Sequence, residues 1–164
     1  MRAARLPRVA SADAGLVADL YVLDTNVYVC ALRNRDELRH LERFLLRAGM
    51  RVRLAGVVVM ELLAGAGSPE HIDATKALFA PYRVRGWTTA PSFDACAEAG
   101  RALAELAIRA RGGRRTIAPS LVNAALLAAS CREAGAVLVT KNVADFAALQ
   151  PRMRGFRCVA PWWL

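Results

Sequence analysis

The chain lacks any long run of apolar residues. No segment of its 164 residues approaches the about 20 consecutive apolar residues that a membrane-spanning helix needs. Residues 1–19 also contain no continuous apolar stretch, because Asp13 and Asp19 interrupt them, so they do not resemble a signal peptide. We therefore expect a cytoplasmic protein without a membrane contact, made of a poorly ordered lead-in over residues 1–19 and one domain over residues 20–164.

Cysteine and histidine are scarce and scattered. The four cysteines form no CxxC pair: they are Cys30, Cys96, Cys131 and Cys158. The two histidines stand alone, and we expect both at the surface. Structural zinc sites need clustered cysteine and histidine ligands, so the sequence argues against zinc. The cysteine pattern is typical of reduced thiols in an intracellular protein.

Lysine is almost absent. Of the 23 basic residues only Lys76 and Lys141 are lysines, and the others are arginines. Acidic residues number 14, so the net charge is +9. This excess favours a polyanionic partner, because phosphates attract cations over long distances. A genome whose codons favour arginine would produce the same bias, so charge alone does not decide between the two explanations.

Apolar segments of two kinds alternate along the chain. The expected strands are residues 20–23, 51–54, 84–88, 137–139 and 156–159. The expected helices begin after Thr25 and Asn26 and then cover residues 36–48, 69–82, 91–111, 121–134 and a short stretch within 142–149. Residues 57–59 favour a strand by composition, and we expect them to lead directly into a helix that carries Glu61. This alternation predicts an α/β fold, a three-layer α/β/α sandwich with a central parallel sheet.

Acidic residues follow the predicted strands. Asp24 ends the first strand, Glu61 lies early in the helix after the second, and Asp145 follows the strand that ends at Thr140. Ligands of such sheets bind outside the carboxyl ends of the strands, where the strand order reverses. Carboxylates that converge there repel one another, so the cleft would hold a hard divalent cation. Oxygen ligands without nearby histidine or cysteine favour Mg²⁺ or Mn²⁺.

With these residues in place, the sequence resembles the PIN-domain family, especially the VapC-like toxins of bacterial toxin–antitoxin pairs. Three blocks carry the resemblance: residues 22–27 (VLDTNV), 58–65 (VVMELLAG) and 138–146 (LVTKNVADF). Each block alone is weak, but their order and spacing across residues 22–146 are fairly specific. The resemblance implies a PIN-like domain that has Asp24, Glu61 and Asp145 as metal ligands.

One position departs from the family pattern. The family usually places an aspartate near the start of the helix over residues 121–134, and the alignment back from Gly135 puts that position on Ala124. An alanine side chain has no oxygen and cannot hold a metal. Two explanations stay open: an engineered change that allows a toxic nuclease to be expressed, or natural loss in a binding-only protein. The three remaining acidic positions favour the first.

The resemblance implies hydrolysis of RNA phosphodiester bonds by one or two metal ions. Asn26, Thr140 and Asn142 would orient the ligands or contact the substrate. A basic, glycine-broken loop would follow the RNA backbone through Arg109, Arg111, Arg114 and Arg115. The family also implies a small antitoxin protein as partner and a homodimer.

Each of these residues has a simpler structural explanation. Asp24 and Asp145 could cap the turn or helix that follows them, and Glu61 could complement a helix dipole. Thr140 and Asn142 could shape a turn, and the arginine loop could be a solvated connection. Trp162 and Trp163 are expected to pack against the domain or a partner rather than stack on bases. Only the joint occurrence of these residues favours the metal site.

Two other functions compete with the nuclease. A catalytically inactive PIN-fold module would bind RNA or protein and have Ala124 as its natural residue. A receiver-like or nucleotide-binding α/β protein would use Asp24 as a phosphoacceptor or phosphate neighbour. The second is disfavoured because the sequence contains no glycine-rich phosphate loop of the GxxxxGK[ST] kind.

Overall fold

The architecture was analysed in a computed structural model, which describes residues 19–109 and 117–162. Within these residues, five strands form one parallel sheet in the order β3-β2-β1-β4-β5. The strands are β1 (Leu20–Leu23), β2 (Val52–Ala55), β3 (Thr88–Thr89), β4 (Ala136–Val139) and β5 (Arg157–Val159). The parallel sheet expected from the sequence is confirmed.

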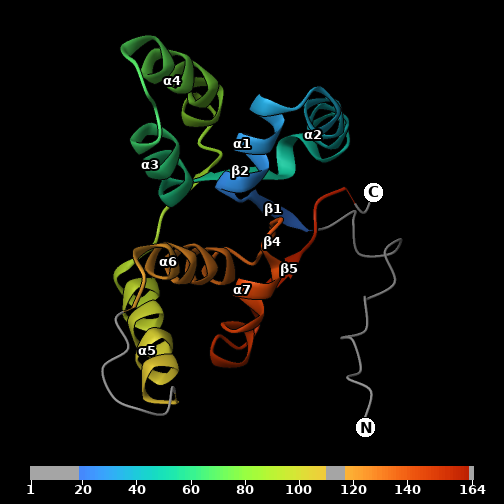
Figure 1. The fold of residues 1–164 in the computed structure, drawn as a ribbon. Coiled ribbons are helices and arrows are strands. Elements are labelled where there is room, and N and C mark those ends of the chain that lie inside the picture. Colours follow the sequence, from blue (N-terminus) through green and yellow to red (C-terminus); the bar gives the residue numbers. More distant parts are fainter. Residues whose placement is uncertain (1–18, 110–116, 163–164) are drawn as a thin grey trace, which may run out of the picture.

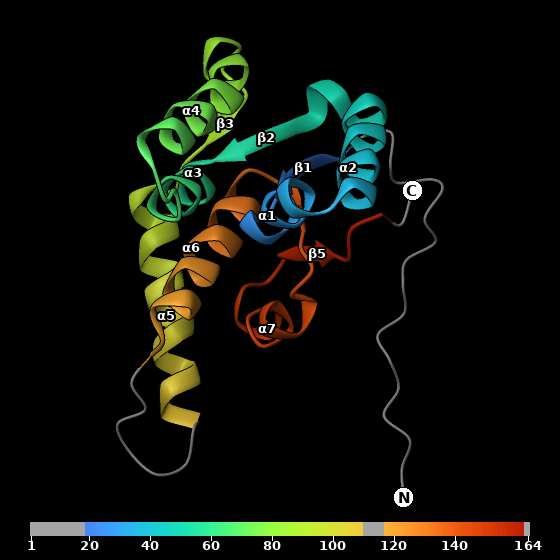
Figure 2. The same cartoon turned by 45° about the horizontal axis from the view of Figure 1, so that its top comes forward.

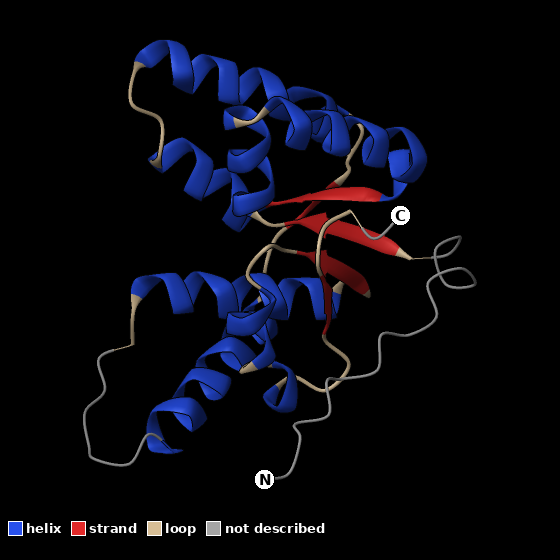
Figure 3. Ribbon diagram, turned by 45° about the vertical axis from the view of Figure 1, so that its right-hand side comes forward, coloured by secondary structure: helices blue, strands red, loops and turns tan. Residues whose placement is uncertain are grey.

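Helices cover both faces of this sheet (Figures 1 and 3). One layer consists of α1 (Thr25–Arg33), α2 (Arg35–Ala48), α3 (Gly56–Ala64) and α4 (Pro69–Val84). The other consists of α5 (Phe93–Arg109), α6 (Pro119–Glu133) and α7 (Val143–Ala147). Short 3₁₀ turns, η1 (Gly49–Arg51) and η2 (Gln150–Arg152), follow α2 and α7. In Figure 2, α4 lies towards the β3 edge of the sheet and α7 towards the β5 edge. The expected three-layer α/β/α sandwich is therefore confirmed.

The strand order reverses between β1 and β4. From β1 the chain builds the sheet outward through β2 to β3, and it then returns to place β4 on the other side of β1. The two central strands are in register, with Leu23 opposite Val139. A reversal of this kind leaves a crevice at the carboxyl ends of the two strands. The residues that follow Leu23 and Val139 are Asp24 and Thr140.

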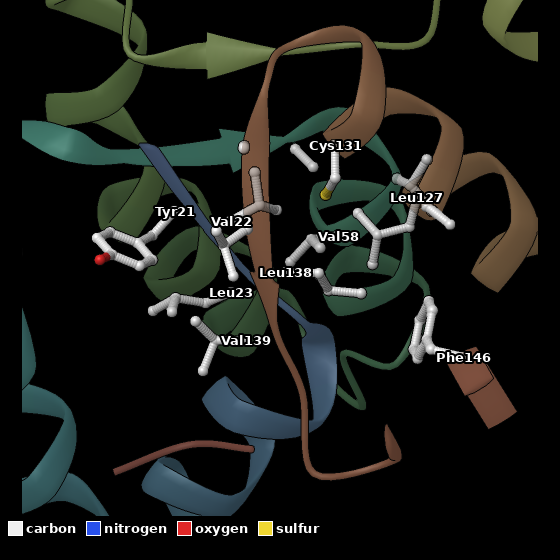
Figure 4. Close-up of a cluster of buried hydrophobic side chains, with 14 of the residues drawn as sticks. Tyr21, Val22, Leu23, Val58, Leu127, Cys131, Leu138, Val139 and Phe146 are labelled. Atoms are coloured by element: carbon white, nitrogen blue, oxygen red, sulfur yellow. The ribbon is translucent and has the colours of Figure 1, made fainter. Parts of the chain in front are cut away.

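The core is built by the alternation of side chains along the central strands (Figure 4). Val22 and Leu138 point towards Leu127 of α6 on one face, whereas Tyr21 lies on the opposite face. There Tyr21 meets Phe44 of α2 edge to face, with ring centroids 5.5 Å apart. Both central strands are almost fully buried, which explains why their sequences are continuously apolar.

The expected strand at residues 57–59 is wrong. The structure ends β2 at Ala55 and starts α3 at Gly56, so these valines belong to a helix. Val57 and Val58 are buried against the core, and this packing outweighs their preference for a strand. Because α3 begins earlier than expected, Glu61 lies in its middle. Glu61 is therefore beyond the first turn, where a carboxylate would complement the helix dipole.

The expected strand at residues 84–88 is also largely wrong. Val84 is the last residue of α4, and only Thr88 and Thr89 pair with β2. Gly86 has a φ of 66°, which produces the turn between helix and strand. The remaining expected helices and strands are present with shifted ends. No helix among the described residues is long and apolar enough to cross a membrane.

Candidate functional site

The side chain of Asp24 lies at the reversal point of the sheet. Asp24 follows β1 directly, and its amide extends the sheet by donating to the carbonyl of Val139 at 2.9 Å. Asp24 is only 8% exposed to solvent. The carboxylate oxygen Oδ2 accepts from the hydroxyl of Thr140 at 2.6 Å and from Asn26 Nδ2 at 2.7 Å. Asp24 is thus held by residues that follow both central strands.

Thr140 and Asn26 join the two sides of the site. Thr140 is fully buried, and its hydroxyl oxygen accepts from Asn26 Nδ2 at 3.1 Å and from the amide of Asn142 at 3.0 Å. The other end of the Asn26 side chain accepts from the amide of Lys141 at 3.1 Å. We expected Asn26, Thr140 and Asn142 to orient the ligands or contact the substrate, and the structure places the first two on Asp24 and Asn142 on Thr140.

Glu61 enters from α3. Its carboxylate accepts a hydrogen bond from the hydroxyl of Thr25 and another from Asn123 Nδ2, the latter at 2.8 Å. Three helices therefore position this one side chain, since Thr25 begins α1 and Asn123 lies in the first turns of α6. Neither contact could be read from the sequence, because Thr25 and Asn123 are 36 and 62 residues away from Glu61.

Asp24 and Glu61 influence each other electrostatically. Burial raises the pKa of Asp24, and the negative charge of Glu61 raises it further. Hydrogen bonds from Thr140, the Thr25 backbone and Asn26 lower the pKa but do not cancel these effects. A buried carboxylate whose pKa is raised in part by a neighbouring negative charge is in the electrostatic condition that a divalent cation relieves.

Asp145 lies apart from this pair. It is exposed in the first turn of α7, where its carboxylate accepts from the side chain of Asn142. It also lines a cavity of about 280 Å³ whose walls include Leu106, Ile117 and Leu121. Among the described residues, no three acidic, histidine or cysteine side chains are grouped closely enough to hold a metal ion. The expected meeting of three carboxylates is therefore not seen in this part of the chain.

Two carboxylates nevertheless fit one form of magnesium site. Mg²⁺ commonly binds through one or two carboxylates and keeps several waters, or takes substrate phosphate oxygens instead. Asp24 and Glu61 supply such a pair, and a cation would offset the burial and the Glu61 charge that raise the pKa of Asp24. The hydrogen bonds from Thr25 and Asn123 use one lone pair on each oxygen of Glu61, and the second lone pair of each oxygen stays available to a cation.

The remaining expected site residues are Ala124 and the four arginines of the basic loop. Ala124 is half-buried in α6 and packs against the core directly after Asn123, so it supplies no polar atom. Arg109 is exposed at the end of α5. Arg111, Arg114 and Arg115 lie outside the described residues. Sequence analysis missed Thr25 as a partner of Glu61.

Comparison with known proteins addresses the fold of the chain. Residues 21–150, most of the chain, match the PIN domain. The chain belongs to the PIN domain family. PIN domains are generally nucleases, and they generally use divalent metals. A search of curated proteins found no match.

Solved structures with the same PIN fold come from toxin–antitoxin complexes. A DNA-bound VapBC from Salmonella typhimurium aligns with a TM-score of 0.63 and 22% identity, over 87% of this chain and 98% of that one. VapBC-1 from nontypeable Haemophilus influenzae aligns with a TM-score of 0.62 and 22% identity, over 86% and 97%. FitAcB from Neisseria gonorrhoeae aligns with a TM-score of 0.58 and 18% identity, over 88% and 100%. At these identities the likeness establishes the shared fold.

Proposed function

We propose that this PIN domain is a metal-dependent endoribonuclease, the toxin of a toxin–antitoxin pair, and that Ala124 weakens or abolishes its activity. The observation that carries the proposal is the position of Asp24. This buried carboxylate lies at the reversal point of the sheet, is held there by Thr140 and Asn26, and has Glu61 as a charged neighbour. The family match and the toxin–antitoxin complexes that share the fold support the same assignment.

The cation would be Mg²⁺ or Mn²⁺, held by Asp24 and Glu61, with Asp145 as the third ligand expected from the sequence. When bound, such an ion activates water and neutralises charge on the phosphate under attack. The protein's own part is positioning. Asn26 and Thr140 fix one carboxylate, and Thr25 and Asn123 fix the other. Asn142, which donates to Asp145, would orient the third.

A binding-only PIN module is the second candidate, and one contact favours it. Asn123 donates a hydrogen bond to Glu61 directly beside Ala124. This bond satisfies a carboxylate oxygen that a metal would otherwise neutralise. In a protein that has lost catalysis, such a bond would replace the missing cation and stabilise these half-buried polar groups.

Cleavage and metal binding together separate the two candidates. Titration calorimetry with Mn²⁺ is performed on the chain, on Ala124→Asp and on Asp24→Asn, and labelled RNA is incubated with each. The nuclease proposal expects metal binding and cleavage to be strongest in Ala124→Asp and absent in Asp24→Asn. Absence of both in all three proteins supports the binding-only module.

The partners belong to the same proposal. VapBC and FitAB are complexes, and their likeness to this chain supports an antitoxin as its cognate partner. We also expect the chain to form a homodimer, which sedimentation of the purified chain would test. Its expected location is the cytoplasm.

A further inference from the structure

Four arginines form a line along α2 and the turn that follows it. Arg39, Arg43, Arg47 and Arg51 are each four residues apart, a spacing that puts side chains on one helix face. Arg43 donates to the carbonyl of Arg39 at 3.4 Å, and Arg51 donates to that of Arg47 at 3.3 Å. The side chains therefore follow one another along the helix for roughly 18 Å. We call this set the arginine ridge.

The ridge is unfavourable for the isolated helix. Like charges at this spacing destabilise a helix, and no other function described above uses these residues. Within the ridge, Arg39 forms an ion pair with Asp36 at 3.0 Å, but Arg43 and Arg47 extend to the exposed surface. Repeated repulsion on one face is relieved by a polyanion, whose phosphates would neutralise the arginines.

An aromatic pocket opens beside the middle of the ridge. It has a volume of about 180 Å³ and is lined by His40, Arg43, Phe44, Arg47 and Trp162. The Trp162 ring lies 5.7 Å from His40 and 6.3 Å from Phe44, measured between ring centroids. A pocket with both guanidinium groups and ring faces offers a phosphate contact and a stacking surface at the same place.

Trp162 is held firmly in this position. Beyond β5 the chain turns towards α2 (Figures 1 and 2), and the indole N–H of Trp162 donates to Glu37 at 2.7 Å. Its φ of 67° lies in the left-handed region, which bulky residues seldom adopt. The expectation that Trp162 packs against the domain agrees with these contacts, but the ring also lines the pocket, so the base stacking that the sequence argued against is open to it.

The pocket is connected to Asp24 by a chain of polar contacts. The second oxygen of Glu37 pairs with the Lys141 ammonium group, and the Lys141 amide donates to Asn26, which donates to Asp24. Glu37 precedes Arg39 by two residues in α2, so these contacts reach the first end of the ridge, whereas Arg51 at its other end lies over the Tyr21 ring near the start of β1.

We propose that the arginine ridge and the aromatic pocket bind single-stranded RNA. The bound nucleotides would be those that extend along α2, away from the scissile phosphate at Asp24. Arg43 and Arg47 contact phosphates, and a base stacks against Trp162 and His40. The proposal rests on the proposed function in taking RNA as the ligand. Charge alone would also suit an acidic protein segment, but the ring-lined pocket between two arginines favours a nucleic acid.

Binding without cleavage tests this surface independently of nuclease activity. A labelled single-stranded RNA of about 12 nucleotides is titrated with the full chain in EDTA, and anisotropy is recorded at several salt concentrations. Arg43→Gln/Arg47→Gln is expected to weaken binding on the order of tenfold. It should also reduce the slope of log K against log salt by about 1.4, the value for two lost phosphate contacts.

The control has the same net charge but leaves the ridge intact. Arg83→Gln/Arg154→Gln removes two exposed arginines, one in α4 and one in the turn before β5, and its slope should stay close to that of the parent chain. Equal losses in both double variants would overturn the proposal, because they would show a general effect of charge. In the Ala124→Asp background, cleavage of long RNA that is unchanged by the two ridge substitutions would also overturn it.

Stacking has its own measurement. Trp87→Phe/Trp163→Phe leaves Trp162 as the only tryptophan, and its fluorescence should be quenched by RNA but not by polyglutamate. The contrary result is that polyglutamate displaces RNA at equal charge concentration while neither ligand quenches the fluorescence. That result would assign the ridge to an acidic protein segment. If nuclease activity is absent even in Ala124→Asp but ridge binding and quenching are found, the proposed function fails and this inference stands.

Discussion

Thr140 donates its hydroxyl hydrogen to Asp24 at 2.6 Å across the boundary between β4 and β1, although 116 residues separate the two in sequence. The bond joins the ends of the two strands at which the sheet reverses its order. Asn26 completes a triangle with them, so that a buried carboxylate has two donors. The arrangement explains how a single charged side chain is tolerated at the centre of the fold.

Thr140→Val should destabilise the protein while leaving its shape almost unchanged. The substitution removes a donor from the buried Asp24 carboxylate and an acceptor from Asn26 and Asn142. Loss of a partner by a buried polar group costs about 1–3 kcal/mol. Urea denaturation measures the difference, with Thr140→Ser as the control that keeps the hydroxyl. A Thr140→Val protein as stable as Thr140→Ser would mean that this bond contributes little.

Ala124→Asp should increase Mn²⁺ affinity and RNA cleavage on the order of tenfold or more, because it returns a carboxylate to the helix that already contacts Glu61 through Asn123. Calorimetry and a gel-based cleavage assay measure the two effects. The matched control is Ala124→Asn, which adds an oxygen but no negative charge. The alignment that assigns this position would be wrong if Ala124→Asp and the parent chain were equally active.

Asn123→Ala should impair activity more than stability. Asn123 lies on a half-buried face of α6 and donates to Glu61 at 2.8 Å, so its loss leaves that carboxylate less well oriented. The loss of a group that orients a ligand typically lowers activity or metal affinity by about 10- to 100-fold. The Ala124→Asp background provides a measurable rate, and Val122→Ala, at an exposed neighbouring position, is the control. Equal cleavage rates in Asn123→Ala and Val122→Ala would show that Asn123 does not contribute to the site.

Stability should depend on pH through Asp24. Its pKa is raised by burial and by the charge of Glu61, so the folded protein binds this proton more tightly than the unfolded chain does. The free energy of unfolding therefore falls as the pH rises from the ordinary aspartate pKa through the raised one. Asp24→Asn should remove this component and show a flatter dependence in that window. Denaturation at a series of pH values, without divalent metal, checks this, and parallel curves would contradict it.

Much of the fold could be predicted from the sequence because its information is local. Strand β1 is an apolar run that ends in Asp24, and α6 begins with a proline and ends before Gly135. Both patterns are visible within a few residues. Val57 and Val58 misled the prediction because their helical state depends on burial against distant elements rather than on their own preference.

The site was predictable only where strand ends define it. Asp24 and Thr140 follow two buried strands, so a parallel sheet brings them together. The contacts of Glu61 with Thr25 and Asn123 depend on how three helices cross, which no spacing in the sequence specifies. For Asp145, the sequence correctly indicates a position soon after β4 but not the direction of the side chain. Asp145 lies in the first turn of α7, and its carboxylate accepts a hydrogen bond from Asn142.

The pairing of β1 with β4 has a consequence during synthesis. A ribosome that has translated residues 1–109 has already produced Asp24 and Glu61, but not the strand and threonine against which Asp24 rests. The crevice can form only after β4 has left the ribosome and docked beside β1, because non-local pairing must wait for both segments. Truncated or stalled chains therefore lack the assembled site. The site exists only when almost the whole domain has been synthesised.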